Sequence, residues 1–170
     1  MVEPNIIYKE SFLRFVVEVK ESGYETYEQY AKAEYNFEEF IEDLIASSKG
    51  INIEEDWAPF TTYWLVSNLE LIGVIRIRHH INSKELKLAG HIGYEIVSSE
   101  RRKGYGTKIL ALGLHKASEL GLEEVIITCD ADNIGSKAVI KKFESNYIGT
   151  SVDDETGKDV NQYKVRTLKK

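Results

Sequence analysis

GHIGYEIVSSERRKGYGTKIL, residues 90–110, has the pattern of a strand that turns through glycine into a helix. Apolar residues alternate over 92–97, as in a β-strand, and over 106–120 they recur at helical spacing, with Gly121 as a good helix end. Between the two elements lies RRKGYG, residues 101–106, with two glycines and three positive charges. A change of chain direction does not need that much glycine and charge, so this turn is the first candidate for a binding site.

The turn is suited to holding an anion. A strand that enters a helix this way exposes unpaired amide N–H groups at the helix start, and together with the helix dipole they attract groups such as phosphate. Gly104 and Gly106 allow close approach of the backbone and positive φ. A glycine turn that only redirects the chain is the alternative. The sequence fits neither GxxxxGK[ST] nor the dinucleotide fingerprint GxGxxG, whose third glycine would fall at Ile109.

The pattern of the whole chain predicts one α/β domain over residues 1–170 with a mixed sheet. The expected order is β-α-α-β-β-β-α-β-α-β-β. Strands are expected at 6–11, 61–68, 69–80, 90–97 and 123–129, helices at 11–23, 34–47, 106–120 and 130–145, and a closing hairpin at 147–168 with its turn at 154–157.

Composition narrows the class of protein. Of the 170 residues, 42% are hydrophobic and 29% charged, which is ordinary for a soluble domain. A net charge of −6 argues against a broad nucleic-acid surface. No apolar run is long enough to span a membrane, no signal peptide is evident, and the single cysteine, Cys129, cannot form an internal disulfide. We therefore expect a cytoplasmic protein. The acidic stretch 25–56 is either a set of solvated helix faces or a wall for a cationic substrate.

Arg101-x-x-Gly104-x-Gly106 resembles the pyrophosphate-binding signature of the GNAT acetyltransferases. Segment 90–110 resembles that family's fourth strand and third helix, and segment 125–142 its fifth strand and fourth helix. The combination of TYWLV, GVIRIRHH, GHIGYEI and ITCDADN also resembles a bacterial GNAT subgroup described only as predicted acetyltransferases. The resemblance implies a GNAT fold and an acetyl-CoA-dependent N-acetyltransferase. Its acceptor would be a primary amine of a small molecule or peptide, attacking directly in a ternary complex, and a homodimer is expected. A catalytically silent CoA-binding module and a phosphate-binding protein unrelated to CoA are the alternatives.

The same resemblance assigns a cofactor site. Strand 91–97 would splay from strand 123–129, and the pantetheine arm of acetyl-CoA would lie in the gap, bonded to the backbone near Ile96 and Val97. Asn133 would reach the same arm, and Ser136 belongs to the same motif. The pyrophosphate would be held around Arg101, Arg102, Lys103, Gly104, Tyr105, Gly106 and Thr107.

Acetyl transfer to an amine requires a base, because a free lysine-type amine has a pKa near 10.4. Glu95, an acid inside an apolar strand, is the candidate; the alternative is an ordinary strand glutamate that reaches solvent or pairs with Arg76 or Arg78 of the neighbouring strand. His91, on the same alternate face, is the second candidate, with a structural role as its alternative. Many GNAT members carry a tyrosine as general acid where this chain has Ile140, so the acid is unassigned. Tyr147 could replace it, unless it is a core tyrosine.

The resemblance implies that the acceptor enters over the first two helices, the side of the strand that carries Glu95, and the closing hairpin. Aromatic residues beside acids suit an amine, although the tyrosines could equally pack the helices. The candidates are Tyr24, Tyr27, Trp57 and Tyr63, with Glu34 and Glu38. The four histidines lack metal-ligand spacing, so no metal is expected.

Overall fold

Six strands form one mixed sheet in a computed structural model of the chain, which describes residues 1–23, 25–82, 89–154 and 156–169. The strand order is β1-β2-β3-β4-β6-β5, with β3 and β4 parallel and the other neighbours antiparallel. The strands are β1 Phe60–Ser67, β2 Glu70–Arg78, β3 Ile92–Ile96, β4 Glu124–Asp130, β5 Ser145–Val152 and β6 Asp159–Arg166. The helices are α1 Lys9–Glu21, α2 Lys32–Tyr35, α3 Phe37–Ser47, α5 Tyr105–Glu119 and α6 Ile134–Ile140, with short 3-10 helices η1 Ile6–Tyr8, η2 Glu25–Gln29 and η3 Ser98–Glu100. The predicted α/β architecture with a mixed sheet is confirmed.

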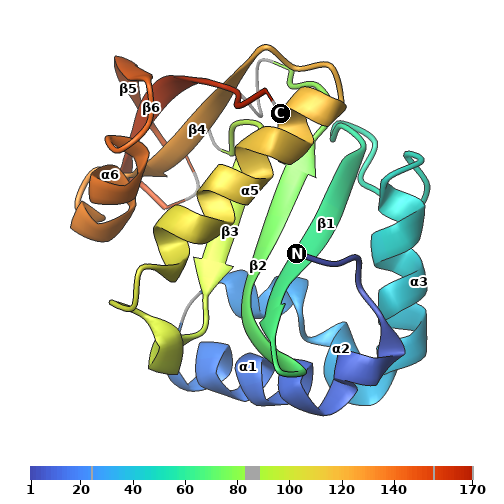
Figure 1. Ribbon diagram of the computed structural model, residues 1–170. Coiled ribbons are helices and arrows are strands. Elements are labelled where there is room, and N and C mark those ends of the chain that lie inside the picture. Colours follow the sequence, from blue (N-terminus) through green and yellow to red (C-terminus); the bar gives the residue numbers. More distant parts are fainter. Residues whose placement is uncertain (24, 83–88, 155, 170) are drawn as a thin grey trace.

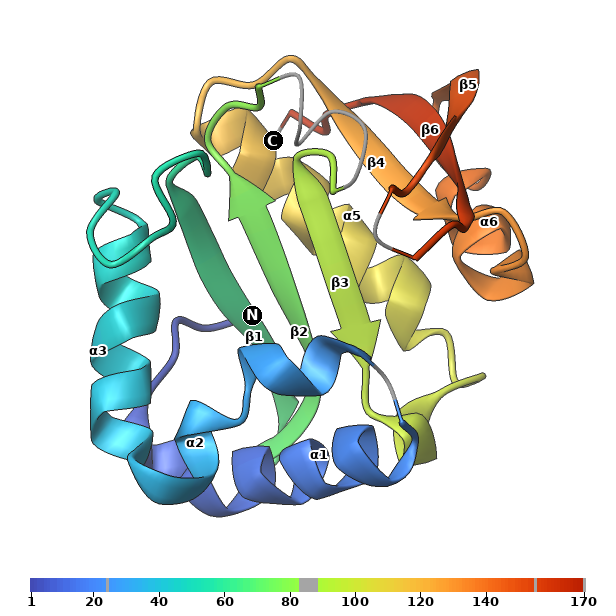
Figure 2. The same cartoon turned by 180° about the vertical axis from the view of Figure 1, so that it is seen from behind.

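Helices cover both faces of the sheet (Figures 1 and 2). On one face α5 packs against β2, where Leu114 joins Ile75 in a buried cluster. On the other face α1, η2, α2 and α3 form a layer whose core is aromatic: Phe12 stacks on Trp64 of β1, with ring centroids 4.7 Å apart. Successive side chains of a strand point to opposite faces. Each position of β2 and β3 therefore belongs either to the α5 side or to the side of the helical layer.

The strand predicted at residues 6–11 is wrong. These residues form η1 and the start of α1, because the Asn5 side chain accepts a hydrogen bond from Ile7 N at 3.1 Å and so caps a helical turn. A capping asparagine competes with extended structure in this way. The N-terminal segment contacts the sheet instead through an isolated bridge between Val2 and Trp64.

The single helix predicted over 34–47 is divided in two. Asn36 leaves helical geometry between α2 and α3, and its side chain accepts a hydrogen bond from Glu39 N at 3.2 Å. Its Nδ2 also donates to the Glu39 carboxylate at 2.7 Å. Asn36 is thus the N-cap of α3, and this local cap explains the break.

β3 and β4 diverge from a single point, as Figure 2 shows. Their ladder has one register pair, Ile92 with Ile127, in the part of the chain that the structure describes, and Gly90 adds an isolated bridge to Ile127. Beyond this vertex the strands separate toward the turn that begins α5. The predicted splay between the two strands is present, and the resulting V-shaped gap sets the position of the site.

Gly73 of β2 lies opposite Ile96 of β3 and allows the two strands to approach closely. A Cβ on residue 73 would come within 2.5 Å of the Glu95 carbonyl oxygen. Gly73→Ala should therefore push the strands apart and lower the free energy of unfolding by about 1–3 kcal/mol, the usual effect of overpacking, with a fall in Tm of roughly 2–4 °C per kcal/mol. Thermal unfolding measures this effect.

Gly93→Ala is the matched control on the neighbouring strand, because a Cβ on Gly93 meets no atom within 4 Å. This variant should unfold at or slightly above the wild-type temperature, since alanine restricts the unfolded chain more than glycine does. Equal destabilisation by both variants would contradict the close-approach explanation.

Candidate active site

The turn between β3 and α5 has the backbone geometry of an anion cradle. Gly104, the N-cap of α5, has φ 86°, and Arg102 two residues earlier has φ 64°. Left-handed residues next to a helix start bring successive N–H groups onto one concave side. The N–H groups of the first turn of α5, residues 105–107, have no carbonyl of the preceding turn to bond. Gly104 is in the positive-φ region, as the sequence predicted for a glycine of this turn.

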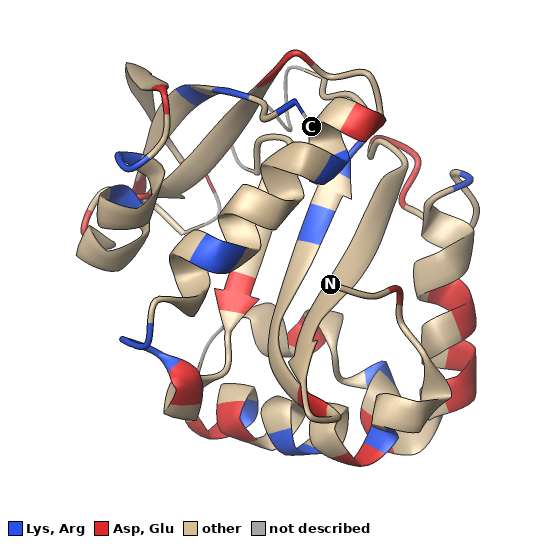
Figure 3. Ribbon diagram, in the orientation of Figure 1, with Lys and Arg blue, Asp and Glu red and all other residues tan. Residues whose placement is uncertain are grey.

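The charges of the turn are only partly directed outward. Figure 3 shows the cationic turn between β3 and α5 with acidic residues on the nearby η3 and α1. Arg101 folds back, and its Nε donates to Ile96 O at 3.0 Å, while Lys103 pairs with Glu100 at 2.8 Å. Arg102 is exposed. Arg101 thus supports the turn from within, while Arg102 leaves its side chain exposed at the surface.

The gap between β3 and β4 is edged by backbone groups that the ladders do not use. Residues 91 and 97 bond to β2 through His91 O and Val97 N, so the alternation of the strand turns the N–H and C=O groups of Tyr94 and Ile96 toward β4. The Val97 groups are committed elsewhere: its N–H donates to Ile72 O and its C=O accepts from Glu100 N. Of the two predicted pantetheine contacts, Ile96 faces the gap and Val97 does not.

His91 fastens the vertex of the gap. Its N–H donates to Ile126 O at 2.7 Å, and its ring Nδ1 accepts from Ile126 N at 2.9 Å. One histidine therefore satisfies both backbone groups of a β4 residue. This geometry favours the structural alternative for His91 over the catalytic one.

α6 borders the gap from the side of β4. Asn133 is its N-cap, and Oδ1 accepts from Ser136 N at 2.9 Å. The hydroxyls of Tyr94 and Ser136 share a hydrogen bond of 3.3 Å, so Tyr94 reaches from β3 to α6. Burial raises the pKa of Tyr94. Sequence reasoning missed Tyr94 as a site residue, because alternation placed it among the core residues and nothing marked the contact with α6.

Glu95 lies on the other side of β3, under η2. Tyr30 OH donates to its Oε2 at 3.4 Å and Thr26 Oγ1 to its Oε1 at 3.5 Å. Burial raises the pKa of Glu95, against the hydrogen bond from Thr26 and the positive charge of Arg101. Within the described part of the chain no ion pair joins Glu95 to Arg76.

A pocket of about 240 Å³ opens beside Glu95, between η2 and the strands β2 and β3. Burial raises the pKa of Glu95, and Glu95 lies next to open space where β3 diverges from β4. The arrangement can accept a proton from a group bound in the pocket. The pocket is lined by Thr26, Gln29, Tyr30, Val74, Arg76, Arg78, Ala89, Ile92, Gly93, Tyr94, Glu95 and Thr128.

The predicted acceptor tyrosines do not line this pocket. Tyr63 lies on the opposite face of the sheet, against the α5 cluster, with Lys116 Nζ 5.5 Å from its ring centroid. Tyr27 bonds through its hydroxyl to Glu34 and packs against Lys20, 4.9 Å from its ring. Tyr24 lies outside the described residues. Whether a tyrosine lines the pocket depends on which sheet face its strand turns it to and on where η2 packs. The sequence pattern fixes neither.

The remaining candidates also have partners of their own. Tyr147 is not a core tyrosine: it is 58% exposed on β5, where its hydroxyl shares a 2.6 Å hydrogen bond with Thr150. Trp57 stacks with Arg78, 4.9 Å from the ring centroid to Cζ. Glu38 is exposed on α3, whose acidic residues face outward in Figure 3. The acidic stretch therefore forms solvated faces on α3.

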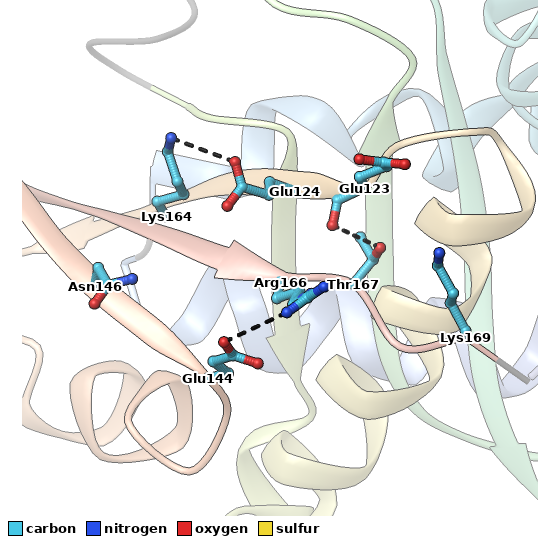
Figure 4. A pocket seen from close by; sticks show the side chains of 8 residues that line it. All are labelled: Glu123, Glu124, Glu144, Asn146, Lys164, Arg166, Thr167 and Lys169. Atoms are coloured by element: carbon cyan, nitrogen blue, oxygen red, sulfur yellow. Dashed lines mark hydrogen bonds and ion pairs between the residues drawn. The ribbon is translucent and has the colours of Figure 1, made fainter.

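A second and larger pocket, of about 440 Å³, lies along β4 and β6 at the C-terminal end of the chain (Figure 4). Four of its charged side chains form two pairs: Lys164 with Glu124 at 3.3 Å and Arg166 with Glu144 at 3.8 Å. Such exposed pairs are typical of a solvated surface. This pocket shares no residue with the one beside Glu95.

In the residues that the structure describes, no group of three His, Cys, Asp or Glu side chains is placed to hold a metal ion. None of the described helices is long and apolar enough to cross a membrane.

A protein-family model and several solved structures are similar to this chain. A family model described as acetyltransferase (GNAT) domain matches residues 13–145. Among solved structures, RimL, a ribosomal L7/L12 alpha-N-protein acetyltransferase in complex with coenzyme A, is similar with a TM-score of 0.67 and 20% identity over 98% of this chain and 92% of that chain.

Two further structures have the same fold. An acetyl transferase from Salmonella typhimurium that modifies the N-terminal serine of ribosomal protein L7/L12 has a TM-score of 0.64 and 20% identity, over 95% of this chain and 90% of that chain. The microcin C7 self-immunity acetyltransferase MccE, in complex with acetyl-CoA and AMP, has a TM-score of 0.63 and 17% identity, over 97% and 89%. The curated proteins contain no match.

Proposed function

Because this chain belongs to the GNAT acetyltransferase family, we propose that it is an acetyl-CoA-dependent N-acetyltransferase. It transfers an acetyl group to a primary amine of a small molecule or peptide by direct attack in a ternary complex. The observation that supports this best is the position of Glu95: it lies on the strand that edges the gap, next to a pocket, and its pKa is raised by burial. The cytoplasmic location and the homodimer stay predictions.

The residues around the gap fit acetyl-CoA. The N–H groups of Arg102 and of residues 104–107 would hold the pyrophosphate, as backbone amides at a helix start do. The inward-facing backbone groups of Tyr94 and the N–H of Ile96 would pair with the amides of the pantetheine arm, whereas the Ile96 carbonyl already accepts from Arg101 Nε. Asn133 Nδ2 makes no hydrogen bond to a described residue and can reach the same arm. When bound, acetyl-CoA supplies an acetyl thioester that is activated toward amines.

Glu95 acts as the base. An amine arrives as an ammonium ion, and a carboxylate oxygen of Glu95 takes its proton, leaving a lone pair for the new N–C bond. Thr26 and Tyr30 fix the carboxylate by hydrogen bonds of 3.5 and 3.4 Å. Burial makes Glu95 a stronger base than an exposed glutamate, because it disfavours the charged form.

Tyr94 is the candidate acid. Its hydroxyl is tied to Ser136 on the far side of the gap, and its raised pKa keeps it protonated at neutral pH. It can donate a proton to the sulfur as the S–C bond breaks. This assignment replaces the exposed Tyr147, which lies on β5 with its hydroxyl bonded to Thr150.

Calorimetric titration with acetyl-CoA, CoA and ATP tests the cofactor. We expect acetyl-CoA and CoA to bind with micromolar Kd and ATP not to bind, because ATP lacks the pantetheine arm that fills the gap. No binding of either CoA species by folded protein would contradict the proposal. Binding without acetyl transfer to any of a panel of amines would favour the silent CoA-binding module instead.

A further inference from the structure

The pocket beside Glu95 is open above Gly93. Gly93 and Arg76 are directly opposed in the β2–β3 ladder, and a Cβ on Gly93 would meet no atom within 4 Å. Glu95 stands two residues along β3 on the same face. Diagonal neighbours on one face of a sheet are roughly 7–8 Å apart. A ligand seated over Gly93 would therefore lie between a guanidinium and a carboxylate.

Arg76 is held in a fixed position. Its Nη1 donates to Gln29 Oε1 at 2.7 Å, and its Cζ lies 4.9 Å from the centroid of the Phe60 ring. Gln29 comes from η2 above the pocket and Phe60 from β1 beside it. The guanidinium plane is thus oriented before any ligand binds, and burial lowers the pKa of Arg76.

One edge of the Arg76 guanidinium is unused. Nε is buried and has no hydrogen-bond partner, and no described residue accepts a hydrogen bond from Nη2. A buried donor without a partner is destabilising, at roughly 1–3 kcal/mol, and calls for an explanation. The Nε and Nη2 donors form the side of the fork that binds a carboxylate through two parallel hydrogen bonds. Nε has almost no accessible surface in this structure, so binding at Nε requires a small movement of the side chains that cover it.

The charges around the pocket disfavour polyamines as acceptors. The charged side chains that line it in the described residues are Arg76, Arg78 and Glu95, two cations and one carboxylate. A polyamine would bring further positive charge next to the arginines. At about 240 Å³ the pocket is also below the usual range for a whole small-molecule ligand, roughly 300–1,000 Å³, so it would hold only one end of an acceptor.

We propose that the acceptor carries a carboxylate close to its amine, and that Arg76 binds the carboxylate while Glu95 receives the proton of the amine. The proposal rests on the acetyltransferase function inferred above for the same site. Arg76 is a specificity residue, and the ligand is recognised as a zwitterion held between opposite charges over Gly93. The carboxylate can belong to a free amino acid or to an acidic first residue of a peptide.

Matched acceptor pairs test the proposal. Alanine against alaninamide probes a free α-carboxylate, and the tripeptide amides Glu-Ala-Ala and Gln-Ala-Ala probe an acidic side chain; spermidine serves as the polycation. Binding is measured by calorimetry with CoA present, and kcat/KM by release of CoA from acetyl-CoA. We expect the carboxylate member of at least one pair to be preferred roughly 10- to 100-fold, the usual strength of a charge-assisted hydrogen bond. The preferred pair identifies the source of the carboxylate.

Arg76→Met should remove this preference while the amide-bearing member and acetyl-CoA keep their wild-type KM. Arg76→Lys, which keeps the charge and loses the fork, should retain a smaller preference. Arg166→Met is the control, because it removes the same charge from an exposed position on β6 far from the site. A merely structural role for Arg76 would weaken both members of a pair equally.

The outcomes separate this proposal from the enzyme function. Turnover with equal kcat/KM for both members of each pair, or preference for spermidine, overturns the carboxylate proposal and leaves the transferase intact. Arg76-dependent binding of the carboxylate without turnover supports the proposal and overturns the transferase. If no acceptor of either pair binds or reacts while acetyl-CoA binds, the carboxylate proposal is wrong.

Discussion

Replacement of Gly104 by glutamate is expected to raise the Kd for acetyl-CoA at least about 100-fold, a loss of roughly 3 kcal/mol. The new carboxylate would stand at the start of α5, where it competes with the pyrophosphate for the same N–H groups and repels its negative charge. A Cβ at this position meets no atom within 4 Å, so the side chain can be accommodated without a clash. Calorimetric titration of the folded variant measures the loss.

Gly104→Asn is the matched control for the backbone strain. Gly104 has φ 86°, and asparagine tolerates the left-handed region better than most residues. This variant should bind acetyl-CoA within a few-fold of wild type, since it adds no charge. An unchanged affinity in Gly104→Glu would show that the cradle does not hold the pyrophosphate.

Glu95→Gln should lower kcat/KM by about 10²- to 10⁴-fold, the range for loss of a general base, with little change in the Kd of acetyl-CoA. The wild-type rate should fall on acidification, because only the ionised carboxylate accepts a proton. Since burial raises the pKa of Glu95 above its ordinary value of 4.5, this fall should begin at a higher pH than for an exposed glutamate. The pH profile of kcat/KM in both proteins measures the effect.

Two controls accompany this variant. Glu42→Gln removes an exposed carboxylate of α3 and should leave kcat/KM and its pH profile as in the wild type. The thermal stability of Glu95→Gln at neutral pH should equal or exceed that of the wild type. A raised folded-state pKa means that stability is lost as pH rises from 4.5 through that pKa, and glutamine removes this loss. Wild-type turnover in Glu95→Gln at every pH would exclude Glu95 as the base.

The elements with strong local patterns could be predicted from the sequence. Alternation marked β3, helical spacing marked α5, and the glycine at 104 marked the turn between them, because each depends on neighbours in the chain. The strand expected at 6–11 failed for the same local reason: Asn5 caps a helical turn, and its hydrogen bond to Ile7 decides the structure there.

The interactions of the site depend on residues far apart in the sequence, and these could not be predicted. Glu95 was recognised as an acid in an apolar strand, but its contacts with Thr26 and Tyr30 follow from the position of η2. Arg76 was considered only as a partner for Glu95, whereas Gln29 takes one of its nitrogens. Periodicity assigns a residue to one of two faces, and only the packing of helices shows what covers each face.

Because β3 and β4 share a single register pair, each of them has a free hydrogen-bonding edge inside the sheet. Past the vertex at His91, both strands present donors and acceptors to each other across a space too wide for a ladder, like the free margins of two separate sheets. A molecule with amide groups along an extended chain, such as the proposed pantetheine arm, would take the position of a missing strand there. Its binding free energy would add to the free energy of folding, since it would bind only when both strand edges are formed. Under this proposal the cosubstrate would be a temporary structural element of the protein as well as its acetyl donor.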